Sequence, residues 1–185
     1  MIKSLCIFCG SRHGTASEHR LQAAKLGELC GRHDVEVVYG GGHVGLMGVV
    51  ADAAMAAGGT VTGLIPEHLL QREAGHRAIS ELIVTENMFD RKDQMIARSG
   101  AFAILPGGLG TLDELFEVLT LRQLACHDKP IILININGFW DPLKILIDHI
   151  VDGGFADPDT SSMMQVVDHV NGVLPALGMG GAEAA

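Results

Sequence analysis

The residues best suited to chemistry form a glycine-rich segment at positions 106–114, PGGLGTLDE. It follows the apolar run 101–105, which predicts a buried strand, and precedes residues 115–121, which predict a helix. Glycines at such a turn let the backbone approach an anion, and the free N–H groups and dipole of the helix favour a phosphate. Glu114 would complement the dipole in a first helical turn but repel a bound anion, so it needs a separate explanation.

A second glycine-rich segment, residues 40–48 (GGGHVGLMG), follows the predicted strand 35–39. Its first six residues match the GxGxxG dinucleotide fingerprint, although glycines at this spacing also serve tight helix–strand packing. The segment follows the second predicted strand, whereas the dinucleotide fingerprint is expected after the first. Glu67 has about the right spacing to be the acid that binds the ribose of a dinucleotide, but it falls after Pro66, outside the strand end. We therefore expect phosphate or nucleotide binding here and do not expect NAD.

Two basic residues, Arg91 and Lys92, come early in a predicted helix at 88–98, soon after the predicted strand 81–85. Such a pair is ordinarily a solvated helix face. Here it follows a strand end, so it is expected to face the same sheet edge as the glycine-rich segments. An arginine at that edge can bind phosphate or ribose hydroxyls through its planar fork.

The cysteines and histidines predict no metal or redox site. Cys6 and Cys9 form a CxxC, but they lie along a predicted strand, where residues three apart point to opposite faces. A redox CxxC belongs at a helix N-terminus. His13 and His43 lack metal-ligand spacing and are interpreted as polar surface groups.

The composition limits the classes of function. The chain has 185 residues, of which 48% are hydrophobic and 19% charged, which indicates one globular domain. Its net charge is -9 and it has no basic run, which argues against nucleic acid or an anionic membrane as partner. The N-terminal apolar run leads into a glycine turn without a cleavage site, and no run is long enough for a membrane span. We expect a soluble, cytoplasmic protein.

The elements that must position these residues alternate between strand and helix. Strands are predicted at 2–8, 35–39, 60–65, 81–85, 101–105 and 130–134, and the main helices at 17–30, 49–57, 88–98, 115–124, 140–151 and 161–174. Residues 67–80 are expected to form a loop with at most one short helix. The pattern predicts an α/β fold: a Rossmann-like, doubly wound, mainly parallel sheet with helices on both faces. We expect a single domain over residues 1–177 and a disordered tail over 178–185.

Three segments together resemble the Lonely Guy (LOG) family. Residues 106–114 are similar to its PGGxGTxxE motif, 40–48 to its glycine-rich loop, and 88–92 (MFDRK) to its MHxRK motif. Residues 6–11 and 127–130 also resemble family segments, so the resemblance extends from about residue 2 to 155.

The resemblance implies a cytokinin riboside 5′-monophosphate phosphoribohydrolase. Such enzymes release an adenine-type base and leave ribose 5-phosphate, many also accept AMP, and they need neither a cofactor nor a metal. The family's catalytic residues correspond to Arg91 and Glu114. The implied substrate-binding positions are Glu73, Lys92, Gly107, Gly108, Leu109, Gly110, Thr111, Thr120, Gly41 and Gly42. One residue departs from the motif: Phe89 replaces the histidine of MHxRK, which bears on substrate preference.

The chemistry of the reaction accounts for Glu114. Cleaving an N-glycosidic bond builds positive charge on the sugar in an oxocarbenium-like transition state. A carboxylate beside C1′ stabilises that charge and can orient or deprotonate water. The glycine-rich turn would anchor the 5′-phosphate, and Arg91 would hold ribose hydroxyls or phosphate.

Two rival functions are weighed against this one. A nucleotide or molybdenum-cofactor carrier would share the fold, but a pure carrier has no need of Glu114. A lysine decarboxylase, a label that some family members carry, needs a pyridoxal phosphate Schiff-base lysine. None of the five lysines stands out for that purpose: Lys3, Lys25, Lys92, Lys129 and Lys144.

Family members of this size are homodimers with the active site near the subunit interface, so the resemblance also implies a homodimer. The apolar helix predicted at 115–124 offers a surface for a partner. A periodic apolar stripe of this kind is more often part of the intramolecular core.

Overall fold

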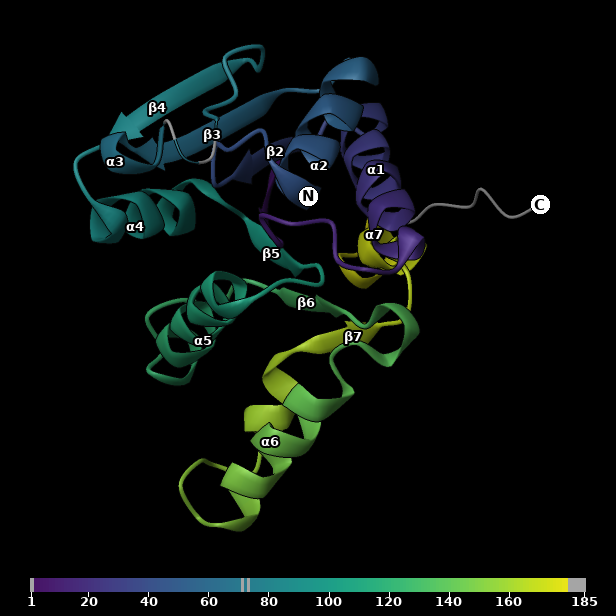
Figure 1. Cartoon of the computed structure of the whole chain (residues 1–185). Helices are drawn as coiled ribbons and strands as arrows, with labels where there is room; N and C mark the ends of the chain where they lie inside the picture. Colours follow the sequence, from purple (N-terminus) through teal and green to yellow (C-terminus); the bar gives the residue numbers. More distant parts are fainter. Residues whose placement is uncertain (1, 71, 73, 180–185) are drawn as a thin grey trace.

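The computed structural model describes residues 2–70, 72 and 74–179. Within them, seven strands form one parallel sheet in the order β4-β3-β2-β1-β5-β6-β7 (Figure 1). The strands are β1 (Ser4–Phe8), β2 (Glu36–Tyr39), β3 (Val61–Pro66), β4 (Glu81–Thr85), β5 (Ala101–Ile104), β6 (Ile131–Ile134) and β7 (Gln165–Val167). The predicted fold class is confirmed.

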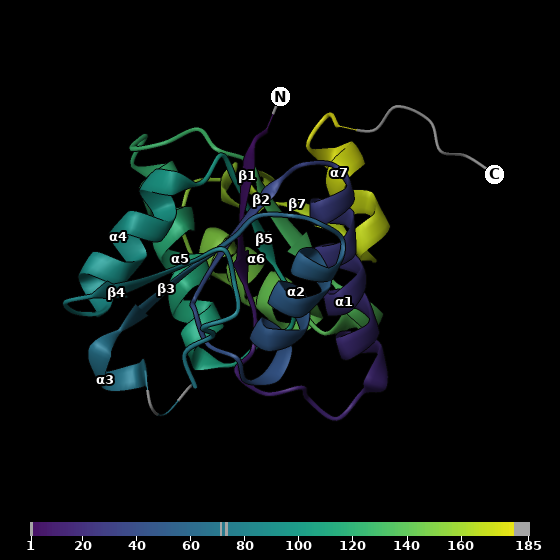
Figure 2. The ribbon, with the colours of Figure 1, turned by 90° about the horizontal axis from the view of Figure 1, so that it is seen from above.

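Helices cover both faces of this sheet. They are α1 (Ser17–Arg32), α2 (Gly45–Ala56), α3 (Glu67–Leu70), α4 (Met88–Arg98), α5 (Leu109–Gln123), α6 (Asp141–Asp152) and α7 (Val173–Ala176). Short 3-10 turns lie at Ile136–Gly138, Thr160–Met163 and Val170–Gly172. Figure 2 shows α1, α2 and α7 together on one side and α4 and α5 on the other. None of these helices has the length and apolar character needed to cross a bilayer.

The alternation of side chains along β1 explains the two layers. Leu5 and Ile7 belong to the core under α1 and α2, whereas Cys6 and Phe8 belong to the core under α4, α5 and α6. A strand that is buried on both faces needs a continuous apolar sequence, and that is what the central strands have. Cys9 belongs to the first core, so Cys6 and Cys9 face opposite sides, as predicted.

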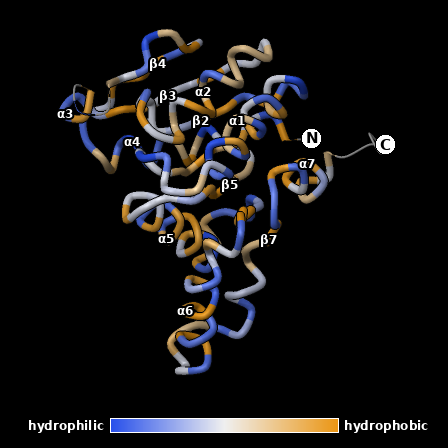
Figure 3. The backbone as a smooth tube through the Cα atoms, turned by 45° about the vertical axis from the view of Figure 1, so that its right-hand side comes forward, coloured by the Kyte–Doolittle hydropathy of each residue, from blue (hydrophilic) through white to orange (hydrophobic). Residues whose placement is uncertain are grey.

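The outer helices are amphipathic. Along α6 hydrophobic and hydrophilic residues alternate around the helix (Figure 3). Its inner residues Leu143 and Ile147 are buried, whereas Ile145 is 69% exposed. The stripe of α5 is likewise turned inward, with Leu115 and Val118 fully buried. This stripe is therefore mainly core, the more ordinary of its two interpretations.

The helix predicted at 161–174 is wrong. Residues Gln165–Val167 form β7, which pairs with β6 at the edge of the sheet, and the flanking residues form 3-10 turns and the short α7. The apolar residues of this segment have a helical spacing, but Val166 and Val167 are β-branched and suit a strand. The hydrogen bonds that the edge of β6 offers favour a strand over a helix in this segment. Of the predicted tail, Gly178 and Met179 are described and Met179 packs on the core, while 180–185 lie outside the described residues.

Two helices begin earlier than predicted, and both starts bear on the site. Helix α2 begins at Gly45 instead of residue 49, and α5 begins at Leu109 after an N-cap at Gly108. Glu114 therefore lies in the second turn of α5 and not in the first. Helix α1 begins at Ser17, the first residue of the helix predicted at 17–30, and Ala16 occupies the cap position. Glycines in a first helical turn are poor helix formers, which is why the sequence placed these starts too late.

The sheet order reverses at β1 and β5, so their carboxyl ends open a crevice for ligands. Backbone hydrogen bonds fix the loops there. The Gly10 N–H donates to the Pro106 carbonyl oxygen at 3.0 Å, and the Leu46 N–H donates to the Gly10 carbonyl oxygen at 3.0 Å. Gly45 has φ +59°, and a Cβ there would overlap the Ser11 backbone. The loops after β1, β2 and β5 thus meet at one edge of the sheet, as the sequence predicted.

Candidate active site

Arg91 and Glu114 face each other across the crevice. The Arg91 Nη2 atom lies 3.6 Å from the Glu114 Oε1 atom, and their side chains are 7% and 10% exposed. Arg91 also donates from Nε to the Leu64 carbonyl oxygen at 3.0 Å. A guanidinium held by both contacts cannot swing freely, so it presents a fixed charge beside the carboxylate. The two predicted catalytic residues, 23 positions apart in the chain, are brought together.

The start of α4 positions Arg91. Asn87 caps this helix, and its Oδ1 atom accepts hydrogen bonds from the Phe89 and Asp90 N–H groups at 2.9 and 3.0 Å. Such a cap stabilises a helix by about 1 kcal/mol. It places Arg91 one turn into α4, on the buried side, while Phe89 on the outer side is 80% exposed. Phe89 lines neither of the cavities described next.

A cavity of about 150 Å³ surrounds the Arg91–Glu114 pair. Its lining comes from the ends of β1 and β2, from the first turns of α2 and α4, and from the first two turns of α5. The lining residues are Ile7, Cys9, Ser11, Gly40, Met47, Arg91, Gly108, Leu109, Gly110, Thr111 and Glu114. We call it the acid pocket. It joins the predicted catalytic pair to the predicted anion-binding turn.

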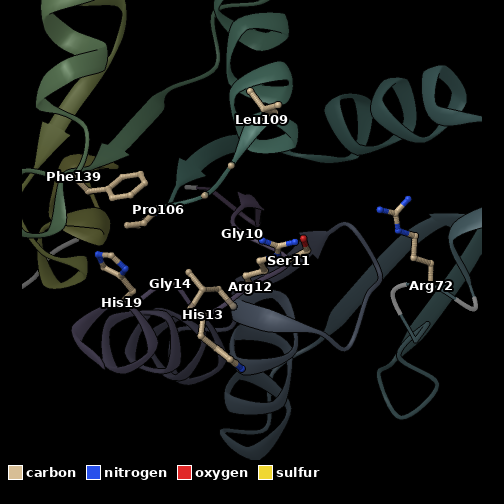
Figure 4. A pocket seen from close by; sticks show the side chains of 13 residues that line it. Gly10, Ser11, Arg12, His13, Gly14, His19, Arg72, Pro106, Leu109 and Phe139 are labelled. Atoms are coloured by element: carbon tan, nitrogen blue, oxygen red, sulfur yellow. The ribbon is translucent and has the colours of Figure 1, made fainter. Parts of the chain in front are cut away.

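A larger cavity of about 590 Å³ adjoins the acid pocket and shares Ser11, Gly108 and Leu109 with it (Figure 4). We call it the outer cavity. Its full lining is Gly10, Ser11, Arg12, His13, Gly14, His19, Leu46, Arg72, Pro106, Gly107, Gly108, Leu109 and Phe139. Among these described residues there are two arginines and two histidines but no carboxylate. In a protein of net charge -9, this local excess of positive charge suits an anionic ligand.

The N-terminus of α5 opens onto both cavities. Gly108 is its N-cap and no side chain caps it. The Leu112 N–H donates to the Gly108 carbonyl oxygen at 3.0 Å, and the N–H groups before it have no acceptor within a helix. A Cβ built at Gly108 or Gly110 would meet no atom within 4 Å. The turn is therefore open and offers backbone donors and the helix dipole to an anion.

The acid pocket keeps its one thiol neutral. Burial first, and then the negative charge of Glu114, raise the pKa of Cys9 far above that of a free cysteine. A neutral buried thiol is a poor nucleophile and a poor metal ligand. The pocket therefore offers carboxylate and guanidinium chemistry.

The structure gathers only some of the predicted substrate-binding residues around the cavities. Gly107, Gly108, Leu109, Gly110 and Thr111 all line one or both cavities.

The other predicted positions do not line them. Lys92 turns away and pairs with Asp113 Oδ2 at 3.0 Å and Glu117 Oε2 at 2.9 Å, which ties α4 to α5. Thr120 is exposed, further along α5. Gly41 and Gly42 are buried, and Gly42 forms an antiparallel bridge with Gly75. Glu73 lies outside the described residues.

Several lining residues were missed by the sequence analysis. Ser11 and Arg12 come directly after β1, so the rule that ligands bind at the carboxyl ends of strands could have identified them. His19 comes from a helix, Arg72 from a loop, and Phe139 directly follows a 3-10 turn, and the three are distant in sequence. No local pattern marks them.

The lysines lie away from both cavities. Lys25, Lys92 and Lys144 form ion pairs, and Lys129 donates to the Ile96 carbonyl oxygen at 2.7 Å. Lys3 is exposed near β1. No lysine lines either cavity among the described residues. A Schiff base with an aldehyde cofactor therefore has no lysine at this site.

Comparison with known proteins identifies the family. The family model described as "Possible lysine decarboxylase" matches residues 47–177. The cytokinin riboside 5′-monophosphate phosphoribohydrolase of Rhodococcoides fascians is 41% identical over 176 residues, which cover 95% of this chain and 89% of the relative. An Arabidopsis thaliana protein of the same name is 42% identical over 156 residues, or 84% of this chain and 73% of the relative.

A solved structure supports the fold. The molybdenum cofactor carrier protein from Chlamydomonas reinhardtii matches with a TM-score of 0.74 at 21% identity, over 96% of this chain and 97% of that chain. At that identity the likeness concerns the fold alone. The sequence relatives decide the family: with 41% identity over almost its whole length, the chain belongs to the Lonely Guy family of cytokinin riboside 5′-monophosphate phosphoribohydrolases.

Proposed function

We propose that this protein hydrolyses the N-glycosidic bond of cytokinin riboside 5′-monophosphates, and of AMP. Water adds to C1′ as the bond to the base breaks, and the bonding electron pair leaves with the base. One water proton ends on the base, so the products are the free base and ribose 5-phosphate. Family membership supports the reaction, and the pairing of Arg91 with Glu114 beside an open helix N-terminus is the observation that carries the mechanism.

The two charges have complementary tasks in this proposal. Glu114 stabilises the positive charge that develops on the sugar ring and takes a proton from the attacking water. Arg91, 3.6 Å away, holds that carboxylate in place and offers donors to ribose hydroxyls or phosphate. The backbone N–H groups of Leu109 and Gly110 anchor the 5′-phosphate, so that C1′ is presented to Glu114.

The decisive assay offers N6-isopentenyladenosine 5′-monophosphate and AMP to the pure protein and measures free base and ribose 5-phosphate. Both products should form in equal amounts without added cofactor. Tight binding of intact nucleotide without any base release would instead support a carrier.

We further propose a homodimer in the cytoplasm. The expected dimer rests on family membership, and exposed apolar side chains are consistent with it: Leu109 is 86% exposed and Leu124 is 66% exposed. Sedimentation velocity at micromolar concentration tests it. A single species with the 19.6 kDa mass of one chain would exclude the dimer.

A further inference from the structure

The segment after α3 is tied to the glycine-rich loop by backbone hydrogen bonds. The His43 N–H donates to the Ala74 carbonyl oxygen at 3.1 Å, and the His76 N–H donates to the Gly41 carbonyl oxygen at 2.9 Å. Gly42 and Gly75 form the antiparallel bridge between these bonds. This short ladder places the segment along the outer edge of the site, beside the loop that lines the acid pocket through Gly40.

A cluster of side chains reinforces the ladder. Asp52 of α2 accepts from the His76 Nε2 atom at 2.9 Å through one oxygen, and its other oxygen lies 3.2 Å from His43 Nε2. The two imidazole rings stack with centroids 3.9 Å apart at 26°. The His76 side chain is only 4% exposed. We call these three residues the His–Asp clamp.

The clamp has the residue types of a metal site, but its geometry is that of a hydrogen-bonded network. A metal ion lies close to the plane of each imidazole that binds it, but the planes of two rings stacked at 3.9 Å and 26° meet only well beyond bonding distance from either ring. The Ala78 N–H also points to His76 Nδ1 at 3.4 Å. This contact favours the tautomer in which Nε2 carries the proton and donates it to Asp52.

Arg72, which lines the outer cavity, lies only four residues before His76 of the clamp. The Gly75 N–H donates to the Leu70 carbonyl oxygen at 2.9 Å, so the two ends of the loop that contains Arg72 are held together. Ala74 in that loop has φ +47°, a left-handed conformation that costs a non-glycine residue about 1 kcal/mol or more. Such a conformation persists only where its surroundings hold it. The clamp and the ladder provide that support.

Arg72 lines the outer cavity opposite His19 and Phe139, with its guanidinium turned inward (Figure 4). It adds positive charge to a cavity that also contains the open N-terminus of α5. We propose that Arg72 binds the substrate's 5′-phosphate and that His76 and Asp52 are positioning residues that hold it there. The proposal rests on the proposed function, since it names a further contact to the same substrate.

The first experiment measures whether the clamp orders the loop. Trypsin cleaves after Arg72 and Arg77, both exposed, only when the surrounding chain opens. In His76→Ala, cleavage at these two bonds should be about tenfold faster than in the wild type. His76→Gln retains a donor for Asp52 and should restore most of the protection. His68→Ala, an exposed histidine on the neighbouring α3, is the matched control and should cleave like the wild type.

The second experiment links the loop to the ligand without requiring turnover. AMP binding is measured by calorimetry in the Glu114→Gln background. Arg72→Ala and His76→Ala should each weaken AMP binding about tenfold, the loss of one charge-assisted contact. The double variant should bind no more weakly than Arg72→Ala alone, because both changes remove the same contact. In the active protein these losses should increase KM and leave kcat within about threefold.

The outcomes separate this inference from the proposed function. If AMP binds tightly and neither single change weakens it, the assignment of Arg72 is wrong. If the two effects multiply in the double variant, His76 acts by another route and is not a positioning residue for Arg72. If AMP does not bind to the parent protein at all, the proposed function itself fails. Zn²⁺ binding at micromolar affinity that His43→Ala abolishes would overturn the hydrogen-bonded clamp.

Discussion

Arg91 Nη2 stands 3.6 Å from Glu114 Oε1, with both side chains at least nine-tenths buried. At that distance the guanidinium orients the carboxylate without a close two-point pairing, which would be shorter. Arg91 places a fixed positive charge beside this buried carboxylate, and the carboxylate gains most from a second positive charge that develops nearby. An oxocarbenium-like sugar supplies that second charge. The pair is therefore suited to transition-state stabilisation.

Replacing the acid tests this directly. Glu114→Gln keeps the size of the side chain and removes its charge, so kcat for base release should fall by about 10²–10⁴-fold. KM should change little, because the phosphate and ribose contacts remain. Circular dichroism should show an unchanged fold. A variant with a kcat within threefold of the wild type would remove Glu114 from the mechanism.

A change at Gly40 should disable Arg91 without mutating it. A Cβ at this position would overlap the Arg91 guanidinium and lie 3.3 Å from Met47 Sδ. Gly40→Ala should therefore push the guanidinium away from Glu114 and lower kcat by at least tenfold, in the same direction as Arg91→Ala.

Gly100→Ala is the control, because its Cβ would find its nearest atom at 3.4 Å, an ordinary contact. That variant should keep wild-type kinetics. Equal rates in the wild type and Gly40→Ala would show that the position of the guanidinium does not matter.

The sequence predicts the fold well because its strands are buried on both faces. Continuous apolar runs such as 101–105 are distinct from the helical patterns around them, and six of the seven described strands were predicted from them. β7 was missed because it is only three residues long, lies at the edge and is partly exposed. Its partner β6 lies more than 30 residues earlier, and no local pattern reports that pairing.

The site residues likewise fall into two groups, those that the sequence predicts and those that only the structure reveals. Glu114 and the turn 107–111 were found because glycine turns at strand ends mark the ligand edge of a parallel sheet. Arg72, His19 and the His76–Asp52 contact depend on loops whose paths are set by tertiary hydrogen bonds. The sequence shows these residues as separate polar groups, and only the fold brings them together.

Two glycines of the predicted anion-binding turn should respond differently to alanine. A Cβ at Gly107 would overlap Thr111 in the first turn of α5, whereas a Cβ at Gly110 would meet no atom within 4 Å. Gly107→Ala should therefore lower the free energy of unfolding by about 1–3 kcal/mol and also weaken substrate binding.

Gly110→Ala should leave stability unchanged or slightly higher, because alanine favours the helix. Its methyl group would enter the acid pocket, so KM should rise. Urea unfolding and steady-state kinetics on both variants check this. The same loss of stability in both would contradict the proposed open space at Gly110.

The four thiols should differ in their reactivity in the folded protein. Cys6, Cys9 and Cys30 are buried, whereas Cys126 is exposed. At pH 8 a disulfide reagent should titrate one thiol in the folded protein and all four in urea. Rapid reaction of more than one thiol in the folded state would contradict the buried positions.

The same burial makes stability fall at alkaline pH. Burial raises the pKa of Cys30 to about 12, whereas the pKa of a cysteine in an unfolded chain is about 8.5. A group whose pKa is higher in the folded than in the unfolded protein stabilises the fold fully at a pH below its unfolded pKa. This stabilisation is lost as the pH rises toward its folded pKa. From pH 8.5 to 9.5 each buried thiol should therefore cost about 1 kcal/mol of unfolding free energy. Cys30→Ala should be less stable at pH 7, because it leaves a small cavity, but should lose less stability over this range. An identical pH slope in Cys30→Ala and the wild type would refute the linkage.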